Sequence, residues 1–271
     1  MRFDSNKAWS EATKLVSGNR DVLWAVAGVF LVLPALAVTL LAPPPEAPAG
    51  AEPEALLNLF SAYYTQAAPW LLGMAVLQII GTLTMLALFT DRARPTVGEA
   101  LQLGLRGLLP AILAQILAGM AFFLAAVVPI TLAGLTGSAA LTTLVVLGCV
   151  AGLIWLAVRI SMIAPVVMVE GQRNPVAVLR RSWELTAGNV GRLLLFYALL
   201  FVGFWVVILL VGGLADMVLR LALGDQIGAP LGAFIAAALQ GVMAIYFTGV
   251  YAATHRQLAG PSREAAARTF E

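Results

Sequence analysis

Arg159 is the residue whose type and place most directly predict chemistry. It lies in an apolar stretch that runs from about Leu141 to Val169. If this stretch is one helix, Arg159 lies about 16 Å from the polar turn at Glu170, at about 1.5 Å per residue, which is inside the hydrocarbon layer. A guanidinium at the centre of a membrane helix costs roughly 2.5–3.5 kcal/mol. The side chain is therefore expected to face the protein interior, a hydrated cavity or a partner.

Three interpretations of Arg159 follow from this placement. The guanidinium can bind an anion or a lipid phosphate, because its planar donors match phosphate oxygens. It can instead be structural, capping backbone carbonyls that Pro165 leaves free or pairing with a carboxylate such as Glu184. In the third interpretation the side chain extends along the helix to the membrane surface.

Gln78, Gln115 and Gln240 are the other strongly polar residues within apolar stretches. One interpretation is a polar seam shared with Arg159, which would serve a transporter or channel for a small anionic or amphipathic solute. The more ordinary interpretation is a set of hydrogen bonds between helices, worth about 0.6 kcal/mol each.

Other kinds of site find little support in the residues. One histidine, His255, and one cysteine, Cys149, make a metal site built by the protein improbable. His255 is interpreted as a membrane-edge residue. No HExxH, GxSxG or phosphate-loop pattern occurs, and no carboxylate pair accompanies the histidine. The net charge of +2, without a basic stripe, argues against nucleic-acid binding. We expect no catalytic residue, no metal and no cofactor.

The elements that must position these residues are membrane helices. The chain has 271 residues, of which 61% are hydrophobic and 11% charged, whereas a soluble domain carries about 25% charged residues. A helix needs about 20 apolar residues to cross the hydrocarbon. We therefore predict one all-α membrane domain over residues 1–271 with six spans, at about 22–41, 68–90, 108–130, 141–169, 193–214 and 230–253.

The basic residues predict the orientation of the chain. With the N-terminus in the cytoplasm, 14 of the 16 lysines and arginines fall in cytoplasmic segments. Arg220 alone lies on the opposite side, and Arg159 lies within a span. The positive-inside rule then places both termini, including the tail 254–271, in the cytoplasm.

A cleaved secretory signal is an alternative for the first span. Basic residues, an apolar run and Ala35-Leu36-Ala37 resemble such a signal with its cleavage site. We favour an uncleaved span, because the apolar run continues to Leu41, whereas signal apolar regions are only about 7–15 residues long.

Amphipathic segments precede three of the spans and suggest a threefold internal repeat. They lie within residues 1–20, at about 97–105 and at about 176–186, the last two behind Pro95 and Pro175, which suit the first turn of a helix. Each unit would consist of a surface helix, an outgoing span and a returning span. A competing interpretation is that these segments are the ordinary basic connectors of any multi-span protein.

The passage from the fourth span into the fifth resembles a known family. The resemblance rests on Arg159, Pro165, Glu170, Pro175 and the run LRRSWELTAGN at residues 179–189. It is similar to the membrane domain attached to certain bacterial glycerophosphodiester phosphodiesterases, and to stand-alone relatives of that domain. The resemblance implies a bacterial inner-membrane protein linked to lipids. The family's hydrolysis belongs to a separate soluble barrel with several catalytic histidines and a metal, so we do not expect it here.

Two functional hypotheses result. The first is a non-enzymatic inner-membrane protein whose amphipathic cytoplasmic segments bind anionic lipid headgroups or partner proteins, including further copies of the chain. The second is the transporter or channel that uses Arg159 and the glutamines. In the first hypothesis the headgroup contacts are Arg173, Arg180, Arg181, Trp183 and Arg192.

Overall fold

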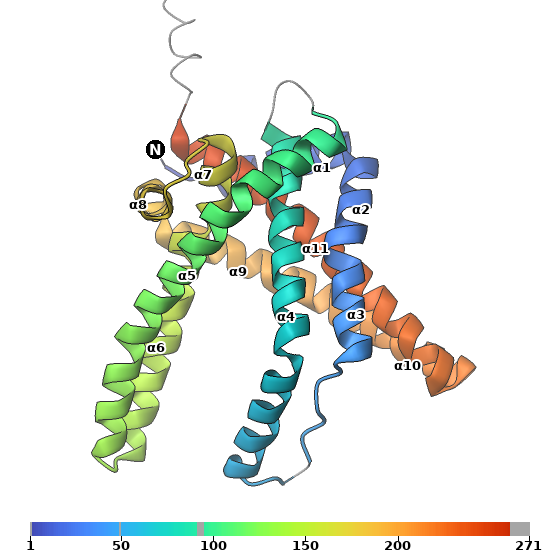
Figure 1. The fold of residues 1–271 in the computed structure, drawn as a ribbon, viewed down its shortest axis with the longest axis vertical. Helices are drawn as coiled ribbons and strands as arrows, with labels where there is room; N and C mark the ends of the chain where they lie inside the picture. The colour runs from blue at the N-terminus through green and yellow to red at the C-terminus, as the bar shows by residue number, and fades with distance from the viewer. Residues whose placement is uncertain (1, 49, 91–94, 261–271) are drawn as a thin grey trace, which may run out of the picture.

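In the computed structural model, which describes residues 2–48, 50–90 and 95–260, the chain is helical, and these residues contain no strand (Figure 1). Six helical stretches are long and apolar enough to cross a bilayer, which confirms the predicted fold class. The helices are α1 (Ser5–Gly18), α2 (Arg20–Ala27), the π-helix η1 (Gly28–Val32), α3 (Leu33–Leu41), α4 (Pro53–Thr90), α5 (Val97–Leu135), α6 (Ala139–Ile160), α7 (Ile163–Val169), α8 (Pro175–Thr186), α9 (Val190–Val207), the π-helix η2 (Ile208–Gly212), α10 (Gly213–Leu223) and α11 (Asp225–Ala259).

Several helices extend beyond the predicted spans. α4 begins at Pro53, so the residues that precede the predicted second span belong to the same helix. α5 begins at Val97, so the amphipathic segment at 97–105 and the third span form one continuous helix. Thr96 starts this helix with a capping box, because its hydroxyl accepts from the Glu99 amide while the Glu99 carboxylate accepts from the Thr96 amide.

The predicted fourth span is not one helix. α6 ends at Ile160, a turn occupies residues 161–162, and α7 begins at Ile163. Pro165 has no amide hydrogen to donate to the Ser161 carbonyl, which removes one helical hydrogen bond at this break. Arg159 therefore lies in the last turn of α6. The depth expected for Arg159 assumed an unbroken helix as far as Glu170, and the structure does not have that helix.

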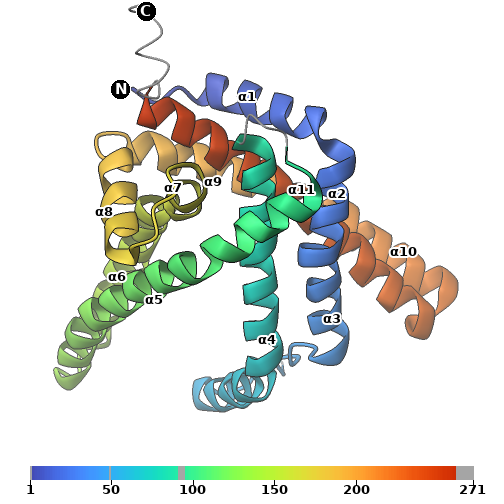
Figure 2. The ribbon, with the colours of Figure 1, turned by 45° about the horizontal axis from the view of Figure 1, so that its top comes forward.

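The helices converge at one end and diverge toward the other. In Figures 1 and 2, α4 and the α5–α6 hairpin separate as they leave the end where α1, α7 and α8 lie. α1 packs along α11, and its buried side chains Ala8, Ala12 and Val16 lie on one face at helical spacing. The predicted amphipathic segments at 1–20 and 176–186 thus correspond to helices packed at this end.

A row of small residues on α5 allows its neighbours to approach closely. The buried row contains Ala100, Gly104, Gly107, Ala111, Ala114 and Ala118. A Cβ added to Gly104 would lie 2.8 Å from Thr84 Oγ1 and 3.2 Å from the Thr84 amide nitrogen of α4. Small residues promote such packing between membrane helices.

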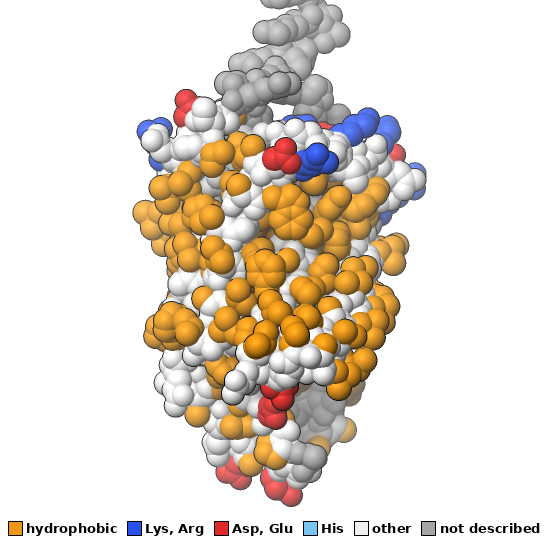
Figure 3. All heavy atoms as spheres, turned by 90° about the vertical axis from the view of Figure 1, so that its right-hand side faces the viewer, with side chains coloured by type: hydrophobic (Ala, Val, Ile, Leu, Met, Phe, Trp, Pro, Cys, Tyr) orange, Lys and Arg blue, Asp and Glu red, His pale blue; other side chains and the backbone are white. Residues whose placement is uncertain are grey.

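Charge separates the two ends of the molecule. Figure 3 shows lysine and arginine side chains at one end, a broad apolar band, and acidic side chains at the other end. We call these the basic end and the acidic end. α1, α8 and the C-terminal turn of α11 lie at the basic end. Arg92, Arg94, Arg263 and Arg268, which support the predicted orientation, lie outside the described residues.

The predicted repeat stays a prediction. The chain follows the expected order of surface segment, outgoing span and returning span three times. The units differ locally, because α1 and α8 are separated from their spans by short breaks, whereas the corresponding part of α5 continues directly into its span.

Candidate functional site at the basic end and in the membrane

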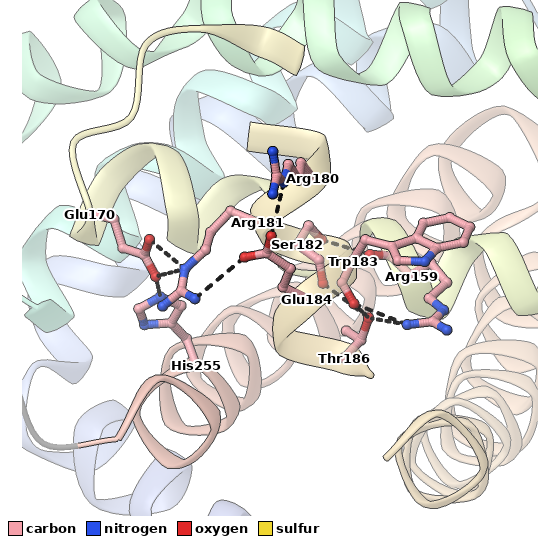
Figure 4. Close-up of polar contacts among 9 residues, drawn as sticks. All are labelled: Arg159, Glu170, Arg180, Arg181, Ser182, Trp183, Glu184, Thr186 and His255. Carbon is pink, nitrogen blue, oxygen red and sulfur yellow. Dashed lines mark hydrogen bonds and ion pairs between the residues drawn. The ribbon is translucent and has the colours of Figure 1, made fainter. Parts of the chain in front are cut away.

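Arg159 joins the end of α6 to α8 (Figure 4). Its Nη1 donates to the Trp183 carbonyl at 3.0 Å and to Thr186 Oγ1 at 3.3 Å. Its guanidinium carbon lies 4.6 Å from the ring centroid of Trp183 and 5.1 Å from that of Trp155. In return, the Arg159 carbonyl accepts a 2.6 Å hydrogen bond from Ser182 Oγ. Cation–π contacts and a backbone acceptor thus take the place of a counter-ion.

These partners favour the structural interpretation of Arg159 but change its details. The arginine does not pair with Glu184, whose carboxylate contacts Arg180 and Arg181 instead. The carbonyl that it caps belongs to Trp183, not to a residue that Pro165 leaves without a donor.

We expect Arg159→Leu to leave membrane insertion intact and to destabilise the protein by about 1–2 kcal/mol, because one charge-assisted hydrogen bond and the cation–π contacts are lost. Arg159→Lys should recover only part of the lost stability, since lysine lacks the planar group that stacks on indole. The check is thermal unfolding in detergent together with tryptophan fluorescence, to which Trp155 and Trp183 contribute two of the six indoles. Unchanged stability and fluorescence would remove Arg159 from the account of α8 docking.

A second polar cluster connects α7, α8 and α11. Glu170 lies directly after α7 and accepts from Arg181 Nε with both carboxylate oxygens, at 2.8 and 3.1 Å. Its Oε1 also lies 2.9 Å from His255 Nε2. The His255 side chain is only 3% exposed, and its Nδ1 has no partner within the described part of the chain. The cluster therefore fastens α8 to the end of α11.

Glu170 is held in its charged form. Burial alone would raise the pKa of this carboxyl, but the hydrogen bonds and charges from Arg181 and His255 outweigh burial, so the pKa lies below the ordinary value. The contact between Glu170 and His255 could not be predicted from the sequence, and the His255 side chain is buried in the protein.

The expected headgroup residues of α8 have different environments. Arg180 is exposed but forms an ion pair with Glu184 at 3.0 Å, four residues along the helix. Arg181 is engaged by Glu170, and the Trp183 ring packs edge-on against Trp155. Arg173 donates to the Arg106 carbonyl at 2.9 Å. Arg173, Arg180 and Trp183 are nevertheless exposed, whereas Arg181 is partly buried.

Arg192 lies in a different setting, together with Arg2. The two arginines border an open depression of about 660 Å³ with Ala187, Gly188 and Asn189. Gly188 has a φ of +75°, a left-handed conformation that favours glycine, and it turns the chain from α8 into α9. Asn189 Oδ1 accepts a hydrogen bond from the Phe3 amide at 2.8 Å. This bond holds the segment before α1 beside the turn. Within the described residues, neither arginine takes part in an ion pair.

The intramembrane glutamines are only partly brought together. Gln78 and Gln115 line one groove of about 290 Å³ where α4, α5 and α7 meet. Its other lining residues are Ala75, Ile79, Thr82, Leu83, Ala111 and Ala164. Gln240 is exposed on α11 and Arg159 is engaged by α8, so neither lines this groove. The polar seam of four residues is thus not assembled here.

No family model, curated protein or solved structure matches this chain. In the described ranges, no three histidine, cysteine or acidic side chains are grouped so as to hold a metal ion. What the arrangement offers is a depression bordered by the guanidinium groups of Arg2 and Arg192 at the basic end, and a groove without charged side chains where α4, α5 and α7 meet.

Proposed function

We propose that this protein is a non-enzymatic integral membrane protein that binds anionic lipid headgroups at its basic end. The observation that carries the proposal is the depression at Arg2 and Arg192, where two guanidinium groups that have no acidic partner among the described residues border one open space. An arginine near a membrane surface attracts anionic lipid with about 1 kcal/mol. Guanidinium also matches the geometry of phosphate oxygens.

The surroundings of the depression support a lipid rather than a soluble anion. The apolar band begins directly below the basic end (Figure 3). In α9, which starts beside the depression, Leu195 and Leu199 are 63% and 64% exposed. A phospholipid can place its phosphate between the arginines and its acyl chains along these leucines.

The proposal also includes the location of the chain. The concentration of basic residues at one end supports a cytoplasmic position for that end and for both termini, and the resemblance described above supports a bacterial inner membrane. Labelling of the Arg180→Cys variant, in a background with Cys149→Ser, checks the orientation. Reaction with a membrane-impermeant reagent from the periplasmic side would contradict it.

The double variant Arg2→Gln/Arg192→Gln is expected to bind phosphatidylglycerol about tenfold or more weakly, because two attractions of about 1 kcal/mol are removed. The measurement is native mass spectrometry of the purified protein titrated with dioleoyl-phosphatidylglycerol, with phosphatidylcholine as the neutral comparison. Folding should be preserved, since both side chains are exposed.

Arg180→Gln is the matched control for this experiment. It removes one guanidinium from the same end, where the double variant removes two, and it does so at a side chain whose charge Glu184 already offsets. We expect it to change phosphatidylglycerol binding by less than about threefold. Equal effects of the control and the double variant would replace the proposed site by a general attraction of the basic end, and no effect of the double variant would refute the site.

A further inference from the structure

The groove at Gln78 and Gln115 contains amide groups that the protein does not satisfy. Neither side chain forms a hydrogen bond with any other described residue. Gln78 is half-buried and Gln115 is exposed. Thr82, one turn after Gln78, adds a hydroxyl to the same groove.

The groove lies within the length of helices that are long and apolar enough to cross a membrane. Gln78 is about 18 Å along α4 from the end of that helix at Thr90, at about 1.5 Å per residue. Leu72 and Val76 of the same helix are exposed, as expected where α4 faces hydrocarbon. Hydrocarbon offers no water to an exposed amide, and an unsatisfied polar group there is unfavourable. Two such amides on one groove therefore call for a ligand that supplies hydrogen bonds.

The lining residues restrict the chemistry of that ligand. The groove contains no charged side chain, so nothing in it would neutralise a phosphate. A glutamine amide both donates and accepts hydrogen bonds, which suits a hydroxyl or an ester group. The remaining lining residues, including Ala75, Ile79 and Leu83, are apolar and suit the beginning of an acyl chain.

The size of the groove favours a lipid over a second copy of the chain. Its volume of about 290 Å³ corresponds to about ten water molecules of liquid, which is enough for a small headgroup and the adjoining methylenes. A helix with its side chains is about 10–12 Å across and would not enter it.

We propose that the groove between α4 and α5 binds an uncharged lipid through its hydroxyl or ester group, with Gln78 and Gln115 as the hydrogen-bonding residues. This site is separate from the basic end, so it does not depend on the proposed binding of anionic headgroups. The lipid enters sideways from the bilayer, on the side where α4 and α5 diverge (Figure 2).

The test uses the full chain in detergent, titrated with dioleoylglycerol and followed by native mass spectrometry. Gln78→Leu/Gln115→Leu is expected to weaken dioleoylglycerol binding about five- to tenfold, the effect of losing two hydrogen bonds within a membrane. Gln240→Leu is the matched control, because it removes an exposed intramembrane glutamine outside the groove. Phosphatidylglycerol binding at the basic end should be unchanged in both variants.

A second variant tests the groove with both amides intact. Ala75→Phe places a large side chain at an exposed lining position, and should weaken dioleoylglycerol binding at least as much. The proposal is overturned if both groove variants bind the lipid like the parent chain, or if Gln240→Leu loses as much binding as they do. It is also overturned if the groove variants convert a dimer into a monomer, because the occupant would then be a second copy.

Discussion

Gly104→Val is expected to destabilise the protein by about 3 kcal/mol, by forcing α4 away from α5. The first atom added at this position already lies 2.8 Å from Thr84 Oγ1 and 3.2 Å from a backbone nitrogen. Thr84 is fully buried and its hydroxyl donates to the Ile80 carbonyl, so it has little freedom to move. Overpacking of this kind usually costs about 1–3 kcal/mol, and a rigid neighbour places it at the upper end. Thermal unfolding in detergent should show a midpoint roughly 5–10 °C lower.

Gly119→Val provides the comparison for this prediction. Gly119 lies on the same helix, and a Cβ there would meet no atom within 4 Å. The substitution therefore adds the same side chain to α5 without a collision, and its unfolding midpoint should stay close to that of the parent chain. If both valine variants unfolded at the same temperature, the close approach of α4 and α5 at Gly104 would not contribute to stability.

Features that depend on neighbouring residues could be predicted from the sequence. Hydropathy over about 20 residues located all six membrane-crossing stretches, because the bilayer requires that length of apolar helix. The start of α8 was similarly visible, since Asn174 precedes Pro175 and its Oδ1 accepts from the Val176 and Ala177 amides. Local hydrogen bonding decides such a boundary, so local sequence reveals it.

The break between α6 and α7 could not be predicted from local sequence. No glycine or proline occupies residues 161–162, and Pro165 is equally compatible with a kink within one long helix. The break is stabilised by contacts with α8, including the bond from Ser182 Oγ to the Arg159 carbonyl. Hydropathy contains no information about that contact, so the sequence predicts one long span where the structure has two helices.

The other contacts that the sequence did not predict join residues far apart in the chain. Glu170 and His255 are 85 residues apart, and Phe3 reaches Asn189 across 186 residues. A single sequence indicates that such residues lie at the same end of the molecule but not which of them touch. The same limit applies to the glutamines, of which Gln78 and Gln115 share a groove while Gln240 does not.

Glu170→Gln should destabilise the protein by about 2 kcal/mol through the loss of α8 docking. The carboxylate accepts from Arg181 at two oxygens and lies 2.9 Å from His255 Nε2. A glutamine amide has one oxygen and can accept only part of these hydrogen bonds. It also leaves the partly buried Arg181 without its main counter-charge. Hydrogen bonds to charged groups contribute about 1.5–3 kcal/mol each, and partial exposure of the pair reduces the total.

Glu184→Gln removes a similar ion pair from a more exposed place. Glu184 contacts Arg180 at 3.0 Å and Arg181 at 3.9 Å, and its side chain is 50% exposed. Exposed pairs contribute about 0.2–1 kcal/mol, so this variant should unfold within a few degrees of the parent chain. Thermal unfolding of both variants in the same detergent compares them directly. A loss at Glu184 as large as that at Glu170 would contradict a special role for the contact with His255.

The pH dependence of the Glu170 effect follows from its pKa. In the folded protein this pKa is lowered below the ordinary value of 4.5, so the folded state binds the proton less readily than the unfolded chain does. The stabilisation is therefore fully present above about pH 4.5 and is lost as the pH falls through the folded pKa. The difference in stability between the parent chain and Glu170→Gln should accordingly shrink as the pH is lowered past this value. A difference that stayed constant into that range would mean that the shape of the side chain, and not its charge, holds α8 to α11.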